Sequence, residues 1–120
     1  MQEYVKKQQN LCKRFGAEYY ASPLDLRIGI SEQLLNNNKV YPINGLRIVP
    51  EGNTTGWYIW GGEKEPSLDD NFFQPLCLTH IDYHCSDIIG YLGLSPGWRF
   101  LIAPNYEDVW FDSNLLNYQK

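Results

Sequence analysis

The stretch SPGWRFLIAPNYEDVWFD, residues 95–112, decides the fold predicted for this chain. It contains two short apolar, aromatic-rich runs, 98–103 and 108–111, with a polar connector between them. Two such runs are typical of a β-hairpin whose loop has about four or five residues. Every second residue from Trp98 to Ile102 is large and apolar, so one face of the first strand must be covered by another part of the chain.

Three earlier segments also have the pattern of β-strands. Residues 24–30 alternate apolar with polar or small side chains, which is typical of a half-buried strand. A helix that begins at Ser22 is the alternative for this segment, but its glycine and β-branched residues argue against it. The runs 46–50 and 56–61 flank a turn-forming segment, and we predict that they form an antiparallel pair.

Two other segments have the periodicity of helices. The apolar residues of 2–15 fall on one side of a helical spiral, and Gly16 provides a C-terminal stop. Residues 79–92 carry an apolar stripe at helical spacing, formed by Ile81, Cys85, Ile88 and Leu92. We therefore predict a single α+β domain over residues 1–120, with a mainly antiparallel sheet of about five strands covered by two helices.

Length and composition exclude several classes of protein. A chain of 120 residues, 43% of them hydrophobic, can bury a core without disulfides or a structural metal. No apolar run approaches the ~20 residues of a membrane helix, and the N-terminus lacks the hydrophobic stretch of a signal peptide. We therefore expect a cytoplasmic protein that does not enter membranes, with its three cysteines as free thiols.

The charge is distributed unevenly along the chain. Residues 1–50 carry seven bases and four acids, a net charge of +3. Residues 51–120 carry three bases and ten acids, a net charge of −7, and the two parts give the −4 of the whole chain. An acidic half of this kind argues against nucleic-acid binding and is better suited to a basic protein partner. Excess acid that only keeps the domain soluble is the alternative explanation.

One cluster combines the side chains that bind zinc. Cys77, His80, His84 and Cys85 have suitable types and a histidine spacing of four residues. If a helix begins at Thr79, however, Cys85 joins the buried stripe about 100° away from His84, so the four groups cannot converge. A site of the first three residues remains an alternative. The sequence has no phosphate-binding loop and no orienting acid beside a cysteine, so we expect no catalytic residue, no metal and no cofactor.

Aromatic and acidic residues also lie close together in two predicted loops. The first loop is 61–71, which follows Trp60, and the second is the turn 104–108 of the hairpin. Aromatic side chains anchor protein interfaces, and acids attract a basic partner. The alternative is that the tryptophans belong to the core and the acids form a solvated rim. We expect the two loops to form an acidic partner-binding surface from Trp60, Glu63, Glu65, Asp69, Asp70, Glu107, Asp108 and Trp110.

Four segments with repeated Gly-Trp and aromatic-acid motifs resemble a known family. They are residues 45–52, 56–63, 91–101 and 106–112. Together they resemble the immunity protein 33 family of bacterial polymorphic toxin systems, formerly described as a domain of unknown function. The resemblance covers roughly residues 24–116 and leaves the predicted N-terminal helix, 1–16, outside it.

The resemblance implies a small cytoplasmic inhibitor that binds a cognate protein toxin and has no catalytic activity. It implies no site residues, and it does not identify the toxin or its activity. Two other functions stay open as alternatives: a metal-binding module or metal-dependent enzyme at Cys77, His80 and His84, and an adaptor protein without a toxin partner. The sequence leaves the oligomeric state undetermined.

Overall fold

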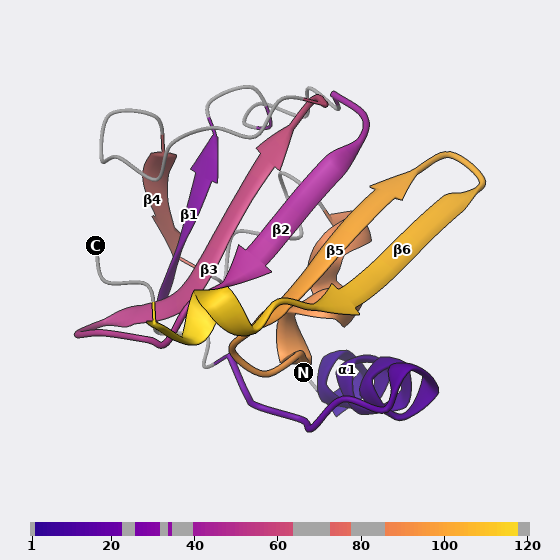
Figure 1. Ribbon diagram of the computed structural model, residues 1–120, viewed down its shortest axis with the longest axis horizontal. Coiled ribbons are helices and arrows are strands. Elements are labelled where there is room, and N and C mark those ends of the chain that lie inside the picture. The colour runs from indigo at the N-terminus through magenta and orange to yellow at the C-terminus, as the bar shows by residue number, and fades with distance from the viewer. Residues whose placement is uncertain are drawn as a thin grey trace.

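The computed structural model describes residues 2–22, 26–31, 34, 40–63, 73–77 and 86–117. These residues form a six-stranded sheet in the order β4-β1-β3-β2-β5-β6 (Figure 1). The helices are α1 (Gln2–Phe15) and two 3₁₀-helices, η3 (Ser86–Gly93) and η4 (Ser113–Asn117). The strands are β1 (Arg27–Ser31), β2 (Ile43–Arg47), β3 (Thr54–Gly61), β4 (Phe73–Cys77), β5 (Trp98–Ala103) and β6 (Tyr106–Phe111).

The prediction of a single α+β domain with a mainly antiparallel sheet is confirmed. Strands β1 and β3 run parallel, and the other four neighbouring pairs run antiparallel. The sheet has six strands where five were expected, because β4 was not predicted as a strand. Pro75 in the middle of β4 argues against a strand in the sequence, because proline cannot donate a hydrogen bond to a sheet ladder. It is tolerated here because β4 is an edge strand.

Strand β2 begins and ends three residues before the predicted 46–50. All five of its residues are buried, so the strand has no alternation of apolar and polar side chains. Its glycine, Gly45, is required by packing: a Cβ there would lie 2.2 Å from a ring carbon of Phe100 on β5. The dipeptide Asn44-Gly45 is typical of a turn in the sequence, but in the fold it lies within the central strand β2.

The hairpin of β5 and β6 has the predicted first strand but a shorter loop. Ala103 pairs with Tyr106, which leaves only Pro104 and Asn105 in the turn instead of four or five residues. Asn105 has a positive φ of 64°. Proline followed by a residue of positive φ is the combination that a type II turn requires, so β6 begins two residues before the predicted 108–111.

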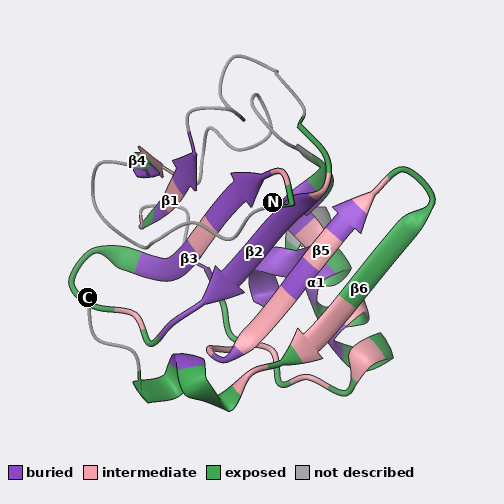
Figure 2. Ribbon diagram, turned by 45° about the horizontal axis from the view of Figure 1, so that its top comes forward, coloured by how far each residue is buried: buried purple, intermediate pink, exposed green. Residues whose placement is uncertain are grey.

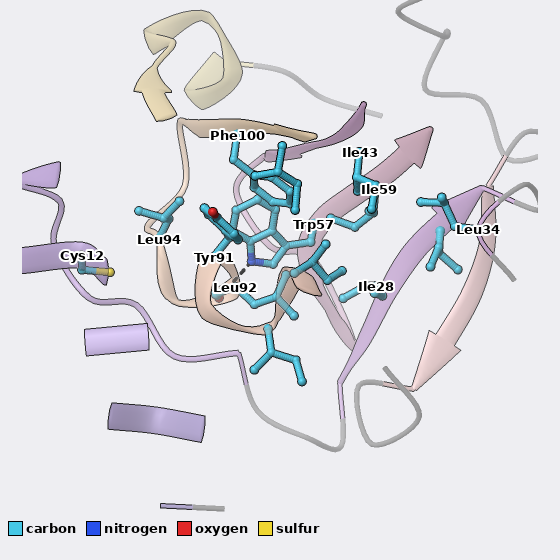
Figure 3. Close-up of a cluster of buried hydrophobic side chains, with 14 residues drawn as sticks. Cys12, Ile28, Leu34, Ile43, Trp57, Ile59, Tyr91, Leu92, Leu94 and Phe100 are labelled. Carbon is cyan, nitrogen blue, oxygen red and sulfur yellow. Dashed lines mark hydrogen bonds between the residues drawn. The ribbon is translucent and has the colours of Figure 1, made fainter. Parts of the chain in front are cut away.

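The main core lies between the sheet and the layer formed by α1 and η3 (Figure 3). Trp57 of β3 lies at its centre, tilted against Phe100, and its indole N–H donates to the carbonyl oxygen of Leu92 at 3.1 Å. Tyr91 stacks on Phe100 with a centroid separation of 4.7 Å. The predicted stripe of 79–92 is confirmed at Ile88 and Leu92, which are fully buried; Ile81 and Cys85 lie outside the described residues.

A smaller cluster covers the opposite face of the sheet. It consists of Leu46, Ile48, Trp60, Phe73 and Leu115, with Tyr58 packed against it. Leu115 comes from η4, so the segment after β6 returns across this face. The helices that the structure describes, α1, η3 and η4, are all too short to span a bilayer.

A buried arginine links the sheet to the layer above it. Arg47 of β2 is 0% exposed, and its guanidinium lies 4.8 Å from the ring of Tyr20 and 5.5 Å from that of Trp57. It donates to five backbone carbonyl oxygens, those of Tyr20, Ala21, Thr55, Leu92 and Leu94. Burial lowers the pKa of Arg47 to about 10, so the side chain stays charged at neutral pH.

Candidate partner-binding surface

The two predicted acidic loops start at the same end of the sheet. Gly61, at the end of β3, and Ile102, near the end of β5, both pair with Ile43 of the intervening strand β2. Neighbouring strands are about 4.8 Å apart, which places the two strand ends about 10 Å from each other. Gly62 and Glu63, which follow β3, and the turn residues Pro104 and Asn105, which follow β5, therefore lie at the same end of the sheet, although about 40 residues separate them in the chain.

Between the hairpin turn and η3 lies a hollow of about 480 Å³. Tyr41 and Tyr106 line it and are 39% and 57% exposed, unusually open for large aromatic side chains. The hydroxyl of Tyr41 donates to a carboxylate oxygen of Asp87 at 3.3 Å, which holds that acid at the rim. The hollow thus offers aromatic surface and carboxylates together. Its other lining residues are Tyr91 and the run 102–107.

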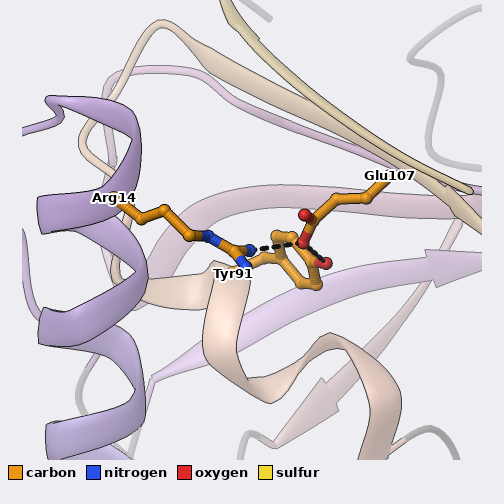
Figure 4. A network of polar contacts seen from close by, with 3 residues as sticks. All are labelled: Arg14, Tyr91 and Glu107. Carbon is orange, nitrogen blue, oxygen red and sulfur yellow. Dashed lines mark hydrogen bonds and ion pairs between the residues drawn. The ribbon is translucent and has the colours of Figure 1, made fainter.

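A polar network closes one side of this hollow (Figure 4). Arg14 of α1 lies 2.7 Å from a carboxylate oxygen of Glu107 on β6, and the hydroxyl of Tyr91 donates to the same oxygen. Burial and the hydrogen bond to Glu107 raise the pKa of Tyr91 well above its usual range. Because Arg14 balances its charge, Glu107 contributes less to the field of this surface than the sequence indicates.

A second hollow, of about 590 Å³, lies on the other side of the network, between α1 and η3. It shares Asp87 and Tyr91 with the first. Lys7 and Arg14 contribute basic side chains to its lining. The acidic character expected for this end of the molecule is therefore limited to the hairpin side, and the helix side is mixed in charge.

The predicted acids and tryptophan of β6 do not share a face. Val109 packs against the main core, so Glu107, two positions away, points to the same helix-covered face. Asp108 and Trp110 consequently point to the opposite face. Trp110 is partly exposed there, and the guanidinium of Arg99 lies 5.4 Å from its ring.

The other predicted binding residues have different positions. Trp60 is 2% exposed and packs edge-on against Phe73 in the smaller cluster, as in the alternative that made it a core residue. Glu63 is exposed, two residues after the end of β3. Glu65, Asp69 and Asp70 lie outside the described residues.

The proposed zinc ligands can be placed only in part. Cys77, at the end of β4, is a half-buried free thiol, and His80, His84 and Cys85 lie outside the described residues. Within the described ranges, no three histidine, cysteine or acidic side chains come together as a metal site. The buried thiol of Cys12 on α1 donates to the carbonyl oxygen of Gly93, and burial raises its pKa.

Sequence reasoning missed three residues of this surface: Arg14, Tyr41 and Asp87. Arg14 lies in the last turn of α1, where the helix dipole already favours a basic side chain, so its position in the sequence points to no partner. Its contact with Glu107 joins residues 93 positions apart, and no local signal indicates such a pair. The Tyr41-Pro42 dipeptide was a detectable turn signal, because proline restricts the residue before it.

Comparison with known protein families identifies the family to which this chain belongs. The family model of the Imm33-like domain matches residues 7–112, which include most of α1 as well as all six strands. The match therefore begins earlier than the resemblance that starts at residue 24. Neither the search of curated proteins nor the search of solved structures found a match. Since the matched residues make up most of its length, the chain belongs to the Imm33-like domain family, a family of immunity proteins.

Proposed function

We propose that this chain is a cytoplasmic immunity protein that binds a cognate bacterial toxin and blocks it by protein–protein contact, without catalysis of its own. The observation that carries the proposal is the family match over residues 7–112. The inhibitor of a toxin needs only a stable fold and a complementary surface, and the packed core around Trp57 provides the first of these.

We assign the contact to a sheet-end surface made of Tyr41, Glu63, Asp87, Tyr106 and Asp108. All five side chains are exposed. Tyrosines supply large contact areas at low entropic cost, and carboxylates around them attract a basic surface and increase the association rate. The net charge of −7 over residues 51–120 acts in the same direction.

The remaining predicted residues take different parts in this proposal. Glu65, Asp69 and Asp70 extend the acidic surface on the evidence of sequence alone. Glu107 supports the hollow through Tyr91 and Arg14 rather than by presenting a free charge. Trp110 lies on the same face of the hairpin as Asp108 and extends the contact along that face. Trp60 is left out because it is buried.

The experiment uses the protein encoded by the gene next to that of this chain, which the proposal expects to carry the toxin domain. Co-expression is expected to protect cells from the toxin, and the two purified proteins are expected to form a complex. A neighbouring product that is toxic but neither binds the chain nor is neutralised by it would refute the proposal. A neighbouring product that binds but is harmless would instead support the adaptor alternative.

The surface itself is tested by reversing two of its charges. The double variant Glu63→Lys/Asp108→Lys is expected to slow association at least about tenfold at low salt, with the difference fading at high salt. The control is Glu18→Lys/Glu51→Lys, which changes the net charge equally at exposed positions elsewhere. Equal on-rates for the two variants across a salt series would show that the sheet-end surface is not the docking site.

A further inference from the structure

Strand β6 is the last strand of the sheet and is hydrogen-bonded on one side only. Its six residues pair continuously with β5, from Tyr106 to Phe111, without a bulge. Within the described part of the chain, no other segment forms backbone hydrogen bonds along β6. Figure 2 shows the strand at the margin of the molecule, with its half nearest the turn exposed.

The register identifies the backbone groups that point away from β5. The amide of Asp112 donates to the carbonyl of Gly97 at 2.7 Å, so these two residues form a hydrogen-bonded pair. In an antiparallel ladder such pairs alternate with pairs whose N–H and C=O groups point outward. The outward groups of β6 therefore belong to Glu107, Val109 and Phe111, and they form a row about 13 Å long.

Proteins usually protect an exposed edge of this kind. Common devices are a proline, a bulge, a very short strand or charged side chains, most often lysine. Residues 106–111 contain no proline, bulge or lysine, and they include the large apolar side chains of Val109, Trp110 and Phe111. Two acids, Glu107 and Asp108, are the charged residues of the strand, and both lie at the end near the turn.

We infer that β6 is where the partner adds a strand: an extended segment of the toxin pairs with β6 as a seventh strand of the sheet. This inference rests on the proposed function and names how the same partner is held. Backbone pairing provides affinity, and side chains at alternate positions provide specificity. Asp108, near the turn end of β6, selects a basic side chain in the added strand, and Trp110 and Phe111 select apolar ones at the other end.

A second copy of the chain is the less favourable occupant of this edge. Each copy carries a net charge of −4, so two copies repel each other. Pairing of β6 with itself would also bring Asp108 of both copies into one seam without a lysine or arginine in either strand. A basic segment of another protein removes this repulsion.

The test compares two substitutions at one outward position. Val109→Pro removes the outward N–H without removing a bond to β5, and proline is tolerated at such a position of an edge strand. Val109→Ala is the matched control, because it removes a similar part of the side chain but keeps the N–H. Both variants are titrated with the neighbouring toxin domain. We expect Val109→Pro to bind at least about tenfold more weakly than Val109→Ala.

Amide hydrogen exchange on the unmodified protein gives a second measurement, which does not depend on the folding of a variant. The amides of Val109 and Phe111 are expected to become protected when the toxin domain binds. A complex without this protection, together with equal affinities of the two variants, would overturn the inference and leave the proposed function intact. Absence of any complex would overturn both. Protection in the protein alone, with a dimer in solution, would identify a second copy as the occupant and would also overturn it.

Discussion

Replacement of Arg47 by methionine is expected to destabilise the protein strongly. Methionine fills much of the same space but provides no donor for the five carbonyl oxygens that the guanidinium contacts. One of them, that of Leu92, keeps two other donors, the hydroxyl of Ser22 and the indole of Trp57. Four carbonyl oxygens would therefore lose a hydrogen bond: those of Thr55 and Leu94 in the buried interior, and those of Tyr20 and Ala21 in part-buried positions.

The size of the effect follows from these four groups. A buried acceptor without its partner costs about 1–3 kcal/mol and a part-buried one costs less, which gives about 4 kcal/mol for the four. Loss of a buried charge offsets part of this cost, because its burial is itself unfavourable, as the lowered pKa of Arg47 indicates. We expect a net loss of about 2–4 kcal/mol, a large fraction of the ~5–15 kcal/mol that stabilises a typical domain.

Urea unfolding followed by tryptophan fluorescence measures this loss, because Trp57 lies 5.5 Å from the guanidinium. A loss of about 3 kcal/mol lowers the midpoint by about 2 M if the slope is about 1.5 kcal/mol per M. The control is Arg27→Met, since Arg27 is exposed at the start of β1 and its replacement should change stability by less than about 0.5 kcal/mol. A loss below about 1 kcal/mol for Arg47→Met would refute the role assigned to the guanidinium.

Two further substitutions test the core and the polar network. Gly45→Ala places a Cβ 2.2 Å from the ring of Phe100, so we expect a loss of about 1–3 kcal/mol and a clearly lower melting temperature in calorimetry; an unchanged value would contradict the packing. The raised pKa of Tyr91 means that the folded state favours the neutral phenol. This preference stabilises the folded protein fully below pH 10, the ordinary pKa of tyrosine, and the stabilisation is lost as the pH rises above 10. Relative to Tyr91→Phe, the unmodified protein should therefore lose about 1.4 kcal/mol per pH unit above pH 10 in urea titrations, and parallel pH profiles would argue against the contact with Glu107.

Elements with one exposed side could be predicted well from the sequence. Helix α1 covers the predicted 2–15, because its apolar side and its polar side alternate with helical spacing. Its end at Gly16 is also as expected, since this residue has a φ of +71° that glycine adopts easily. Strand β5 spans the predicted 98–103 for a related reason: Phe100 and Ile102 are buried, and the residues beside them are only partly buried.

Elements buried on both sides, or at an edge, could not be predicted in the same way. Strand β2 has no exposed side, so its sequence pattern does not show where the strand begins or ends. The need for glycine at position 45 becomes clear only from the ring of Phe100 that packs against it. Strand β4 contains a proline that an edge tolerates, and only its place in the sheet shows that it is an edge. Such features depend on neighbours that are distant in the chain.

The candidate surface, too, could be predicted in its composition but not in its arrangement. The sequence indicates an excess of acid and aromatic residues near 61–71 and 104–108, but it does not indicate which way each side chain points. The pairing of β6 with β5 turns Glu107 toward Arg14 and Asp108 to the other face. The excess of acidic residues could therefore be predicted from the sequence, whereas the face to which each acid points could be known only from the pairing of the strands.

The two proposals about this protein meet at one strand. The sheet-end surface uses Tyr106 and Asp108 of β6, and the added toxin strand uses the outward groups of the same strand, beginning at Glu107. A partner strand that pairs with Val109 and continues about five residues toward the turn extends past it, because each residue advances the strand by about 3.4 Å. Its basic side chains then reach the carboxylates of the sheet-end surface. Strand addition without any effect of Asp108→Lys on the association rate would separate the two proposals, and would show that the backbone edge holds the partner without help from charge.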